Sequence, residues 1–261
     1  MAKVVSGTAI RDAINVLEGK AIYDGKEYEL YVRKAQLGNK IYVDLGDDRW
    51  RAIEISEDGW KIIEDCPVRF KRSKNMLPLP IPERGGEIDV LKGLINAQTE
   101  ENWILVLARL TQAFWCKGLY AHLYLRGTQG TAKSYMMQTL KAISDPSAAI
   151  KRRLPKSERD AAIAIGSEAI SCFDNMSGID DSMADLWCVA STGGVSTQRA
   201  LFTDDEEAVI NLKCPIIANG IADLGQRGDL LDRTIVIDLE PIPESERKTE
   251  KEMQAATDTL S

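Results

Sequence analysis

The sequence predicts an α/β protein: a core built on a parallel sheet, preceded by a helical segment and a small β-rich unit. Two patterns carry this prediction. After residue 118, apolar runs of strand length alternate with amphipathic runs of helix length, as in strands joined by crossover helices. Before residue 85, short runs alternate apolar and polar residues between Gly and Asp turns, which is typical of antiparallel strands.

Residues 1–84 are expected to form the small β-rich unit. Its expected strands cover 26–32, 40–44 and 50–55. Pro78, Pro80 and Pro82 then stiffen the chain into an extended linker, because each proline fixes φ and removes a hydrogen-bond donor. The first domain boundary is therefore placed near residue 84.

Residues 85–118 are expected to form a helical collar, because apolar residues recur there at helical spacing. The larger α/β core follows over 119–247, and 248–261 is expected to be a polar tail. The elements expected in the core are strand 119–125, helix 133–144, helix 157–167, strand 169–173, helix 181–191, a hairpin over 196–213, and strands 215–218 and 234–239.

Composition narrows the class of protein. The 261 residues carry a net charge of −7 and contain no run of the roughly 20 apolar residues that a membrane span needs. The first residues lack the apolar centre of a signal peptide, so a cytoplasmic protein without a membrane partner is expected. The acidic balance argues against a surface that coats nucleic acid as a whole, although basic charge can still be focused locally.

The cysteines and the single histidine exclude several kinds of chemistry. The five cysteines are scattered, odd in number and never spaced as metal ligands, so reduced thiols are expected rather than a zinc site. They are Cys66, Cys116, Cys172, Cys188 and Cys214. His122 stands in an apolar run, where a packed core position is expected, and a triad or metal site built on histidines is excluded within this chain.

A glycine-containing turn connects the strand 119–125 to the helix that begins near Lys133. It consists of Gly127, Thr128, Gln129, Gly130, Thr131, Ala132, Lys133 and Ser134, with Tyr135 following. Without a Cβ, Gly127 and Gly130 let the backbone aim N–H groups at phosphate oxygens. Lys133 would supply a cation to the β- and γ-phosphates of ATP, and Ser134 a hydroxyl to Mg²⁺. The alternative is a strand-to-helix turn that binds nothing.

Ala132 departs from the usual pattern G-x-x-x-x-G-K-[ST], which has glycine directly before the lysine. Alanine fits this position if the backbone there has ordinary helical dihedrals. A positive φ would strain it, because the left-handed region brings Cβ too close to the following carbonyl.

A second apolar strand ends in Asp174 and Asn175. A carboxylate at the end of a buried strand can hold Mg²⁺ through water, whereas the alternative is a core strand capped by a turn-forming pair. Most ATPases with such a phosphate loop follow the aspartate with a glutamate, whereas Asn175 occupies that place here, and an amide cannot accept a proton from water. Hydrolysis is then slow, or is assisted by a nearby carboxylate. The candidates are Glu168, Asp180 and Asp181.

The third strand ends in Asn219, and two arginines, Arg227 and Arg233, precede the fourth. An asparagine at a central strand end can contact the γ-phosphate or the lytic water, and an arginine from a neighbouring subunit can neutralise charge in phosphoryl transfer. Alternatively, Asn219 is a turn residue and the arginines belong to a solvated or salt-bridged surface.

With these motifs in place, the chain resembles the AAA+ ATPases of phage, prophage and plasmid replication modules, which are related to superfamily-three helicases. The resemblance spans residues 21–247. The strings that carry it are 42–47, 59–60, 68–70, 77–80, 127–134, 145–147, 173–175, 203–207 and 229–233.

The resemblance implies a P-loop AAA+ core and a role for each motif. Lys133 and Ser134 match the Walker A pair, Asp174 the Walker B carboxylate and Asn219 the sensor-1 residue. Arg233 matches the arginine finger, with Arg227 as the second candidate. It further implies a Mg²⁺-ATPase that forms a homo-oligomeric ring, expected to be a hexamer, and acts as a helicase on single-stranded or forked DNA beside a primase or polymerase. The alternative is an ATP-dependent loader or nucleotide-gated scaffold that does not separate strands.

Two segments are candidates for DNA contact. Over 69–74, Arg69, Lys71 and Arg72 interleave with the aromatic Phe70, as in a strand that tracks a phosphate backbone, although a solvated loop is an equal alternative. In the expected hairpin 196–213, Arg199 and Lys213 could contact phosphate. The acidic turn 203–207 would repel it, so a subunit contact remains the alternative there.

Overall fold

The computed structural model describes residues 6–199, 207–225, 227–249, 251–253 and 255, and the chain divides into two units, 1–30 and 31–261. The first unit holds helix α1 (Gly7–Asp24), whose N-terminus is capped by the Ser6 hydroxyl. This helix was not among the expected elements. Ile10, Ile14 and Leu17 recur there at helical spacing, a signal that the expectation of a β-rich unit over 1–84 did not use, and all three are exposed.

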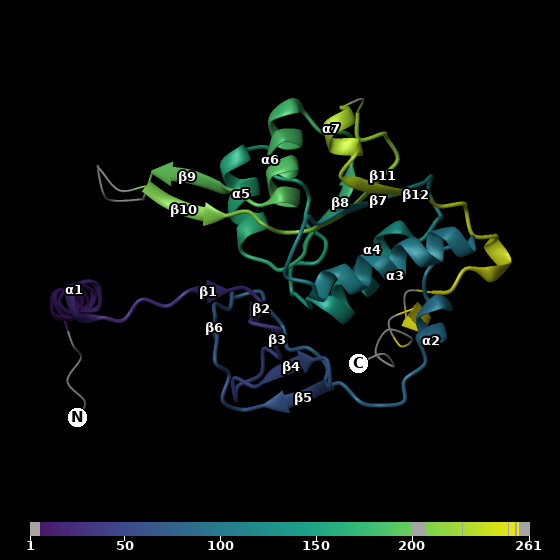
Figure 1. Ribbon diagram of the computed structural model, residues 1–261. Coiled ribbons are helices and arrows are strands. Elements are labelled where there is room, and N and C mark those ends of the chain that lie inside the picture. Colours follow the sequence, from purple (N-terminus) through teal and green to yellow (C-terminus); the bar gives the residue numbers. More distant parts are fainter. Residues whose placement is uncertain (1–5, 200–206, 226, 250, 254, 256–261) are drawn as a thin grey trace. The chain divides into compact units, whose positions relative to one another are not determined.

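A small antiparallel sheet begins the second unit (Figure 1). Its strands run in the order β2 (Lys34–Leu37), β3 (Lys40–Asp44), β4 (Ala52–Ser56) and β5 (Gly59–Ile63). The strands expected over 40–44 and 50–55 are present as β3 and β4. Only the end of the strand expected over 26–32 forms, as β1 (Leu30–Tyr31), which pairs with β6 (Arg69–Phe70).

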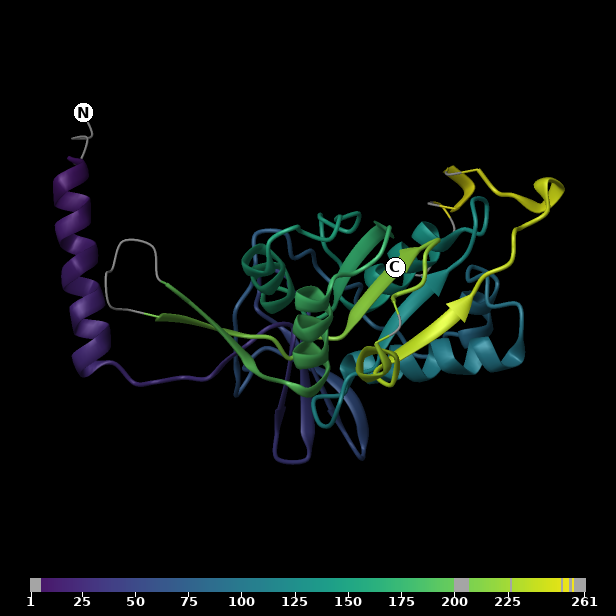
Figure 2. The same cartoon turned by 90° about the horizontal axis from the view of Figure 1, so that it is seen from above.

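The core is an α/β assembly around a four-stranded parallel sheet, as the sequence predicts (Figure 2). The strand order is β12 (Thr234–Asp238), β7 (His122–Arg126), β11 (Ile216–Gly220) and β8 (Ser171–Met176). In the register, Asn219 of β11 lies beside Leu125 of β7. The carboxyl ends of β7, β8 and β11 therefore meet at one edge of the sheet.

Helices cover both faces of this sheet (Figure 1). On one face pack α2 (Ile88–Lys92), α3 (Glu100–Phe114) and α4 (Lys133–Ser144). On the other pack α5 (Glu158–Gly166), α6 (Asp181–Thr192) and the short α7 (Gly228–Leu231). The hairpin strands β9 (Val195–Arg199) and β10 (Glu207–Asn211) pair with each other outside the sheet. After β12 the chain forms a 3-10 turn, η1 (Glu244–Glu246). Among the described residues, no helix is long and apolar enough to cross a lipid bilayer.

His122 occupies the packed core position that the sequence predicts. Its side chain is fully buried, Nδ1 accepts the Ile216 N–H at 3.1 Å, and Nε2 lies 2.8 Å from the Trp187 carbonyl oxygen. Because Nδ1 is an acceptor, Nε2 carries the proton and donates to that carbonyl. Burial lowers the pKa of His122 to about 4. The ring is therefore a neutral structural link between β7, β11 and α6.

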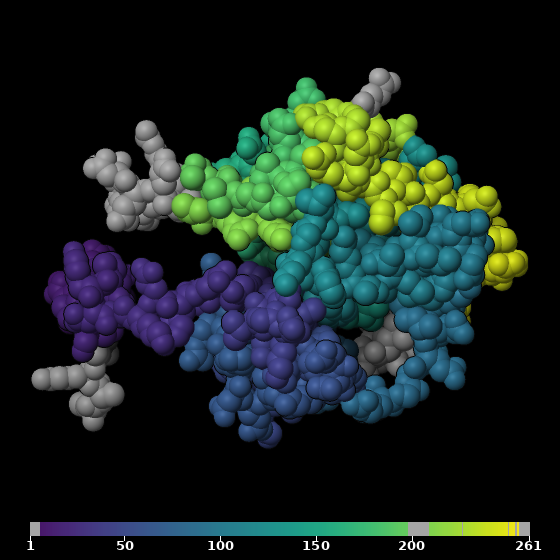
Figure 3. Space-filling model, in the orientation of Figure 1, coloured from purple at the N-terminus to yellow at the C-terminus, as the bar shows by residue number. Residues whose placement is uncertain are grey.

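A buried ionic cluster fixes the small sheet to the core. Arg33, at φ +62°, donates from Nε to Asp145 Oδ1 at 2.9 Å, and Lys141 Nζ lies 2.7 Å from Asp145 Oδ2. Burial disfavours the charged form of Asp145, yet the adjacent cations Lys141 and Arg33 hold the pKa of this carboxyl below its usual value. Lys141 also donates to the Ile170 carbonyl at the start of β8. Phe114, at the end of α3, packs against apolar residues of the small sheet, so the blue surface of that sheet meets the teal surface of α3 (Figure 3).

Candidate nucleotide site

The loop between β7 and α4 is shaped by close backbone packing. A Cβ on Gly127 would lie 2.7 Å from the Leu239 carbonyl oxygen and 2.9 Å from Thr131 Oγ1, so only glycine fits there. Gly130 has φ +84°, which side chains rarely adopt. Gln129 is exposed at the tip. The two glycines that the sequence singles out are thus required by the path of the chain.

Ala132 has φ +57° and ψ +24°, the left-handed conformation. This is the strained outcome of the two that the sequence left open for alanine at this position. Ala132 also occupies the N-cap of α4 without a capping side chain. The first N–H groups of this 12-residue helix therefore face the loop without an N-cap acceptor, and the positive end of the helix dipole points the same way.

Lys133 and Ser134 begin α4 and point in different directions. Lys133 Nζ lies over the loop and donates to the Thr128 carbonyl oxygen at 2.6 Å, while Ser134 Oγ donates to Asp174 Oδ1 at 2.7 Å. Partial burial lowers the pKa of Lys133, which the Asp174 carboxylate opposes. Tyr135, also expected beside the ligand, donates its hydroxyl to the Met253 carbonyl at 2.7 Å.

Asp174, Asn175 and Asn219 meet at the carboxyl ends of β8 and β11. Asn219, which is 1% exposed, donates from Nδ2 to Asp174 Oδ1 at 2.7 Å and accepts the Asn175 N–H on Oδ1 at 3.0 Å. The register between the two strands shifts between Ala218 and Gly220, and Asn175 takes φ +57° there. Such irregularities re-aim side chains next to functional sites. Three segments distant in sequence thus converge on one carboxylate.

The carboxylates that could replace the missing glutamate are engaged elsewhere. Glu168 is buried and contacts Lys141 at 3.4 Å and Arg152 at 3.2 Å. Asp180 caps α6, accepting the Met183 N–H at 2.9 Å. Asp181 is exposed in the first turn of that helix, 3.8 Å from Arg227.

Arg233 lies at the opposite end of the sheet from the loop, whereas Arg227 donates to the Asp181 carbonyl at the start of α6, the helix that follows β8. The Arg233 carbonyl accepts the N–H of His122, the first residue of β7, whereas the loop follows the last residue of that strand. The strand separates them by about 13–17 Å, at 3.3 Å per residue. Arg233 donates from Nη1 to the Asp229 carbonyl at 2.5 Å, and Arg227 pairs with Asp229 and Asp185.

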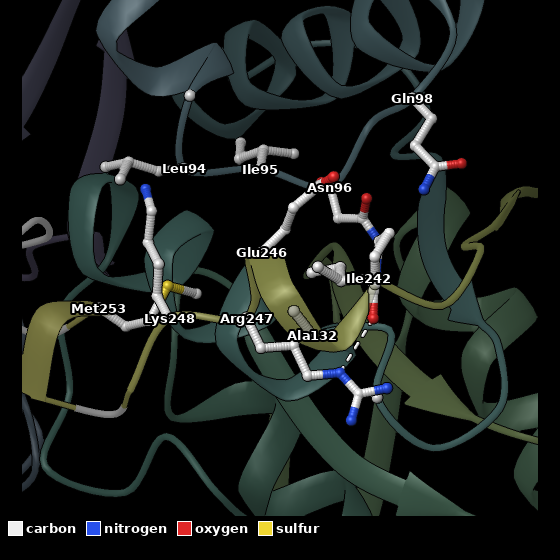
Figure 4. A pocket seen from close by; sticks show the side chains of 13 residues that line it. Leu94, Ile95, Asn96, Gln98, Ala132, Ile242, Glu246, Arg247, Lys248 and Met253 are labelled. Atoms are coloured by element: carbon white, nitrogen blue, oxygen red, sulfur yellow. Dashed lines mark hydrogen bonds between the residues drawn. The ribbon is translucent and has the colours of Figure 1, made fainter.

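A cavity of about 430 Å³ opens beside the loop, between the α2–α3 connection and the segment after β12 (Figure 4). Asn96 Nδ2 donates to the carbonyls of Thr131 and Glu240, both at 3.0 Å, and so joins the three segments. Arg247 Nε donates to the Ile242 carbonyl at 2.9 Å, and its guanidinium lies against Gly130. Sequence reasoning missed Asn96 and Arg247, because neither belongs to a local motif.

The residues expected to contact DNA have different surroundings. Arg69 and Lys71 are exposed, and Lys213 Nζ lies 5.5 Å from the centre of the Tyr120 ring. Arg72 is committed within the protein, at 2.8 and 2.6 Å from the two Asp44 carboxylate oxygens. Arg199 ends β9, but its side chain and the turn 203–206 lie outside the described residues.

The comparisons with known proteins identify the family of the chain. The model of the family of actinomycete integrative conjugative element replication proteins matches residues 88–260, and the chain belongs to that family. The predicted role in replication of a mobile element is thereby confirmed at this level. None of the curated proteins matches the sequence.

Solved structures support the fold. The A form apo structure of the NrS-1 C-terminal region has 16% sequence identity and a TM-score of 0.52, over 98% of this chain and 59% of that one. A structure of JCV helicase has 11% identity and a TM-score of 0.39, over 59% of this chain and 45% of that one. The latter is too distant to carry an argument. The chain therefore spans little more than half of the NrS-1 structure whose fold it shares.

Proposed function

We propose that this replication protein is a Mg²⁺-dependent ATPase that assembles into a ring and moves along DNA as a helicase. The observation that carries the proposal is the convergence of Ser134 and Asn219 on Asp174, each at 2.7 Å. A hydroxyl that follows a glycine loop and a carboxylate from a neighbouring strand are the oxygen ligands that a magnesium–nucleotide site uses.

The residues present fit this ligand. The N–H groups at the start of α4 and the Lys133 ammonium face the loop, where they would bind the phosphates. Ser134 and Asp174 would hold Mg²⁺, which when bound neutralises charge on the phosphate oxygens. Asn219 positions Asp174 through its amide and fixes the Asn175 backbone at the same time. The cavity between Asn96 and Arg247 would take the nucleoside.

The ring follows from the position of Arg233. Because the arginine lies at the opposite end of β7 from its own loop, it can reach a nucleotide only on a neighbouring subunit. A ring closes when each copy presents this edge to the loop of the next. A single copy would then bind ATP but hydrolyse it poorly, and the hexamer expected from the family resemblance is one such ring.

A second function, a loader or nucleotide-gated scaffold, is favoured by Asn175. Asn175 cannot accept a proton from the attacking water, and the candidate carboxylates are engaged elsewhere. Slow turnover suits a protein that changes state once per loading event. Slow turnover is less suitable for a motor, which consumes ATP at each step.

The two functions are separated by measuring ATP hydrolysis and strand separation on the same forked DNA. The wild type is compared with Lys133→Ala and Asp174→Ala, and Lys156→Ala serves as a matched control because it removes an exposed lysine outside the site. We expect DNA-stimulated hydrolysis in the wild type and the control, and its loss in the two site variants. Hydrolysis without strand separation would select the loader, and undiminished hydrolysis in Lys133→Ala would overturn the site.

A further inference from the structure

Trp50, in the connection between β3 and β4, is a bulky residue held in an unusual conformation and left open to solvent. Its φ is +59° and its side chain is 55% exposed. A large side chain at positive φ is an outlier that persists only where the surroundings impose it, and such outliers gather at functional sites. The connection is therefore a candidate ligand-binding surface.

The connection is held rigidly by one acidic residue. The Trp50 N–H donates to the Asp47 carbonyl at 3.2 Å. The Asp47 carboxylate accepts both the backbone N–H and the Nε of Arg51, at 3.0 and 2.6 Å. Arg72 Nη1 donates to the same Asp47 carbonyl at 2.5 Å. These bonds fix the backbone on both sides of Trp50 and present its ring at the surface.

Arg72 covers the indole from one side. Its guanidinium lies 3.7 Å from the ring centre and is itself locked by two bonds to the Asp44 carboxylate, at 2.8 and 2.6 Å. A guanidinium stacked on a ring orients that ring and adds a cation beside it. The remaining exposed surface of Trp50 is flat, aromatic and preorganised, which is what a stacking partner needs.

The charges around Trp50 favour an anionic partner. Arg49, Lys71 and Lys74 are exposed neighbours of Trp50 or Arg72 along the chain, and Asp48 is the one exposed acid within the connection. Asp44 and Asp47 are already paired with arginines. This local excess of cations stands out in a chain whose net charge is −7.

We propose that Trp50 is a stacking platform for a base of single-stranded DNA, with Arg49, Lys71 and Lys74 contacting the adjacent phosphates. An aromatic platform flanked by cations is the common means of binding single strands without sequence preference. This inference rests on the proposed function for the nature of its partner. It also replaces Phe70, the aromatic that the sequence offered for stacking, which is half-buried in the small-sheet cluster with Tyr42.

The test is binding of a fluorescein-labelled oligothymidylate, followed by anisotropy at fixed salt without nucleotide. Trp50→Ala is compared with Trp50→Phe and with a matched control, Trp115→Ala, because Trp115 is 53% exposed but lies at the end of α3. We expect Trp50→Ala to weaken binding by about 5- to 150-fold, Trp50→Phe to weaken it less, and Trp115→Ala to bind as the wild type. The same strand in duplex form should bind more weakly, because its bases are already stacked.

Three results would overturn the inference. The first is wild-type affinity in Trp50→Ala, and the second is equal affinity of the wild type for single strands and duplex. The third combines two findings: Trp50→Ala shows no thermal unfolding transition, and Trp50→Phe matches the wild type in affinity and in DNA-induced tryptophan quenching. Trp50 would then serve the fold alone. A wild type that binds DNA through Trp50 but hydrolyses no ATP would contradict the proposed motor function without contradicting this inference.

Discussion

Replacing Ala132 by glycine tests whether the loop stores strain at the position where it departs from the usual motif. Ala132 is in the left-handed region, at φ +57° and ψ +24°, and its side chain is only partly buried. The substitution removes the contact between Cβ and the backbone without taking away a hydrogen-bonding group. The Ala132 carbonyl keeps its bond from the Met136 N–H, at 2.9 Å.

The expected change in the free energy of unfolding follows from two opposing effects. A non-glycine residue in the left-handed region costs roughly 1–2 kcal/mol, which glycine avoids. Glycine also has more conformational entropy in the unfolded chain, which lowers the stability of the folded state by about 0.4–1 kcal/mol. The net result for Ala132→Gly is a stabilisation of about 0.5–1 kcal/mol, or about 1–4 °C in Tm for a protein of this size.

Urea unfolding and thermal melting of Ala132→Gly measure this directly. Ala142→Gly is the matched control, because Ala142 lies inside α4, where glycine should destabilise by about 1 kcal/mol. The two variants make the same chemical change and are expected to shift Tm in opposite directions. If both lower Tm by a similar amount, Ala132 carries no strain and the reasoning from its φ fails.

Three further predictions concern the site and the core. Asn219→Ala should lower kcat about 100-fold with little change in nucleotide Kd, because Asp174 loses its positioning amide; an equal loss in Kd would make Asn219 a binding residue instead. Mixing Arg233→Ala with Lys133→Ala subunits should restore part of the ATPase activity that each lacks alone, and no recovery at any ratio would refute an arginine acting between subunits. Since the pKa of His122 falls from 6.5 to about 4 on folding, its contribution to stability is complete above pH 6.5 and should fall by about 1.4 kcal/mol per pH unit towards pH 4. His122→Asn should remove that part of the slope in urea melts, and an unchanged slope would argue against a buried neutral ring.

Local patterns predicted the elements that position the site. The helix expected over 133–144 is α4 with the same bounds, since its start follows the loop and its apolar spacing is regular. Asp174 and Asn219 could be placed together because the carboxyl ends of parallel strands meet at one edge. Helix bounds, which depend on apolar periodicity, and the meeting of strand ends, which depends on strand direction, were therefore predictable from the sequence.

Features set by tertiary contacts were not accessible. Asn96 and Arg247 reach the loop from segments that carry no motif, and only the folded chain brings them beside Gly130. Arg72 reads as an exposed cation in sequence, yet it is bonded to Asp44, 28 residues away along the chain. The φ of Ala132 was left open for the same reason, because it is imposed by the path between β7 and α4.

Calorimetric titration of the full chain with ATP tests the central claim most directly. With Mg²⁺ present, the wild type should bind one nucleotide per chain, and Lys133→Ala should bind far more weakly. Asp174→Ala should lose the dependence of affinity on Mg²⁺, because that carboxylate is the acid that holds the ion. Equal affinity in wild type and Lys133→Ala, or no heat of binding at all, would contradict the assignment of the loop as a nucleotide site.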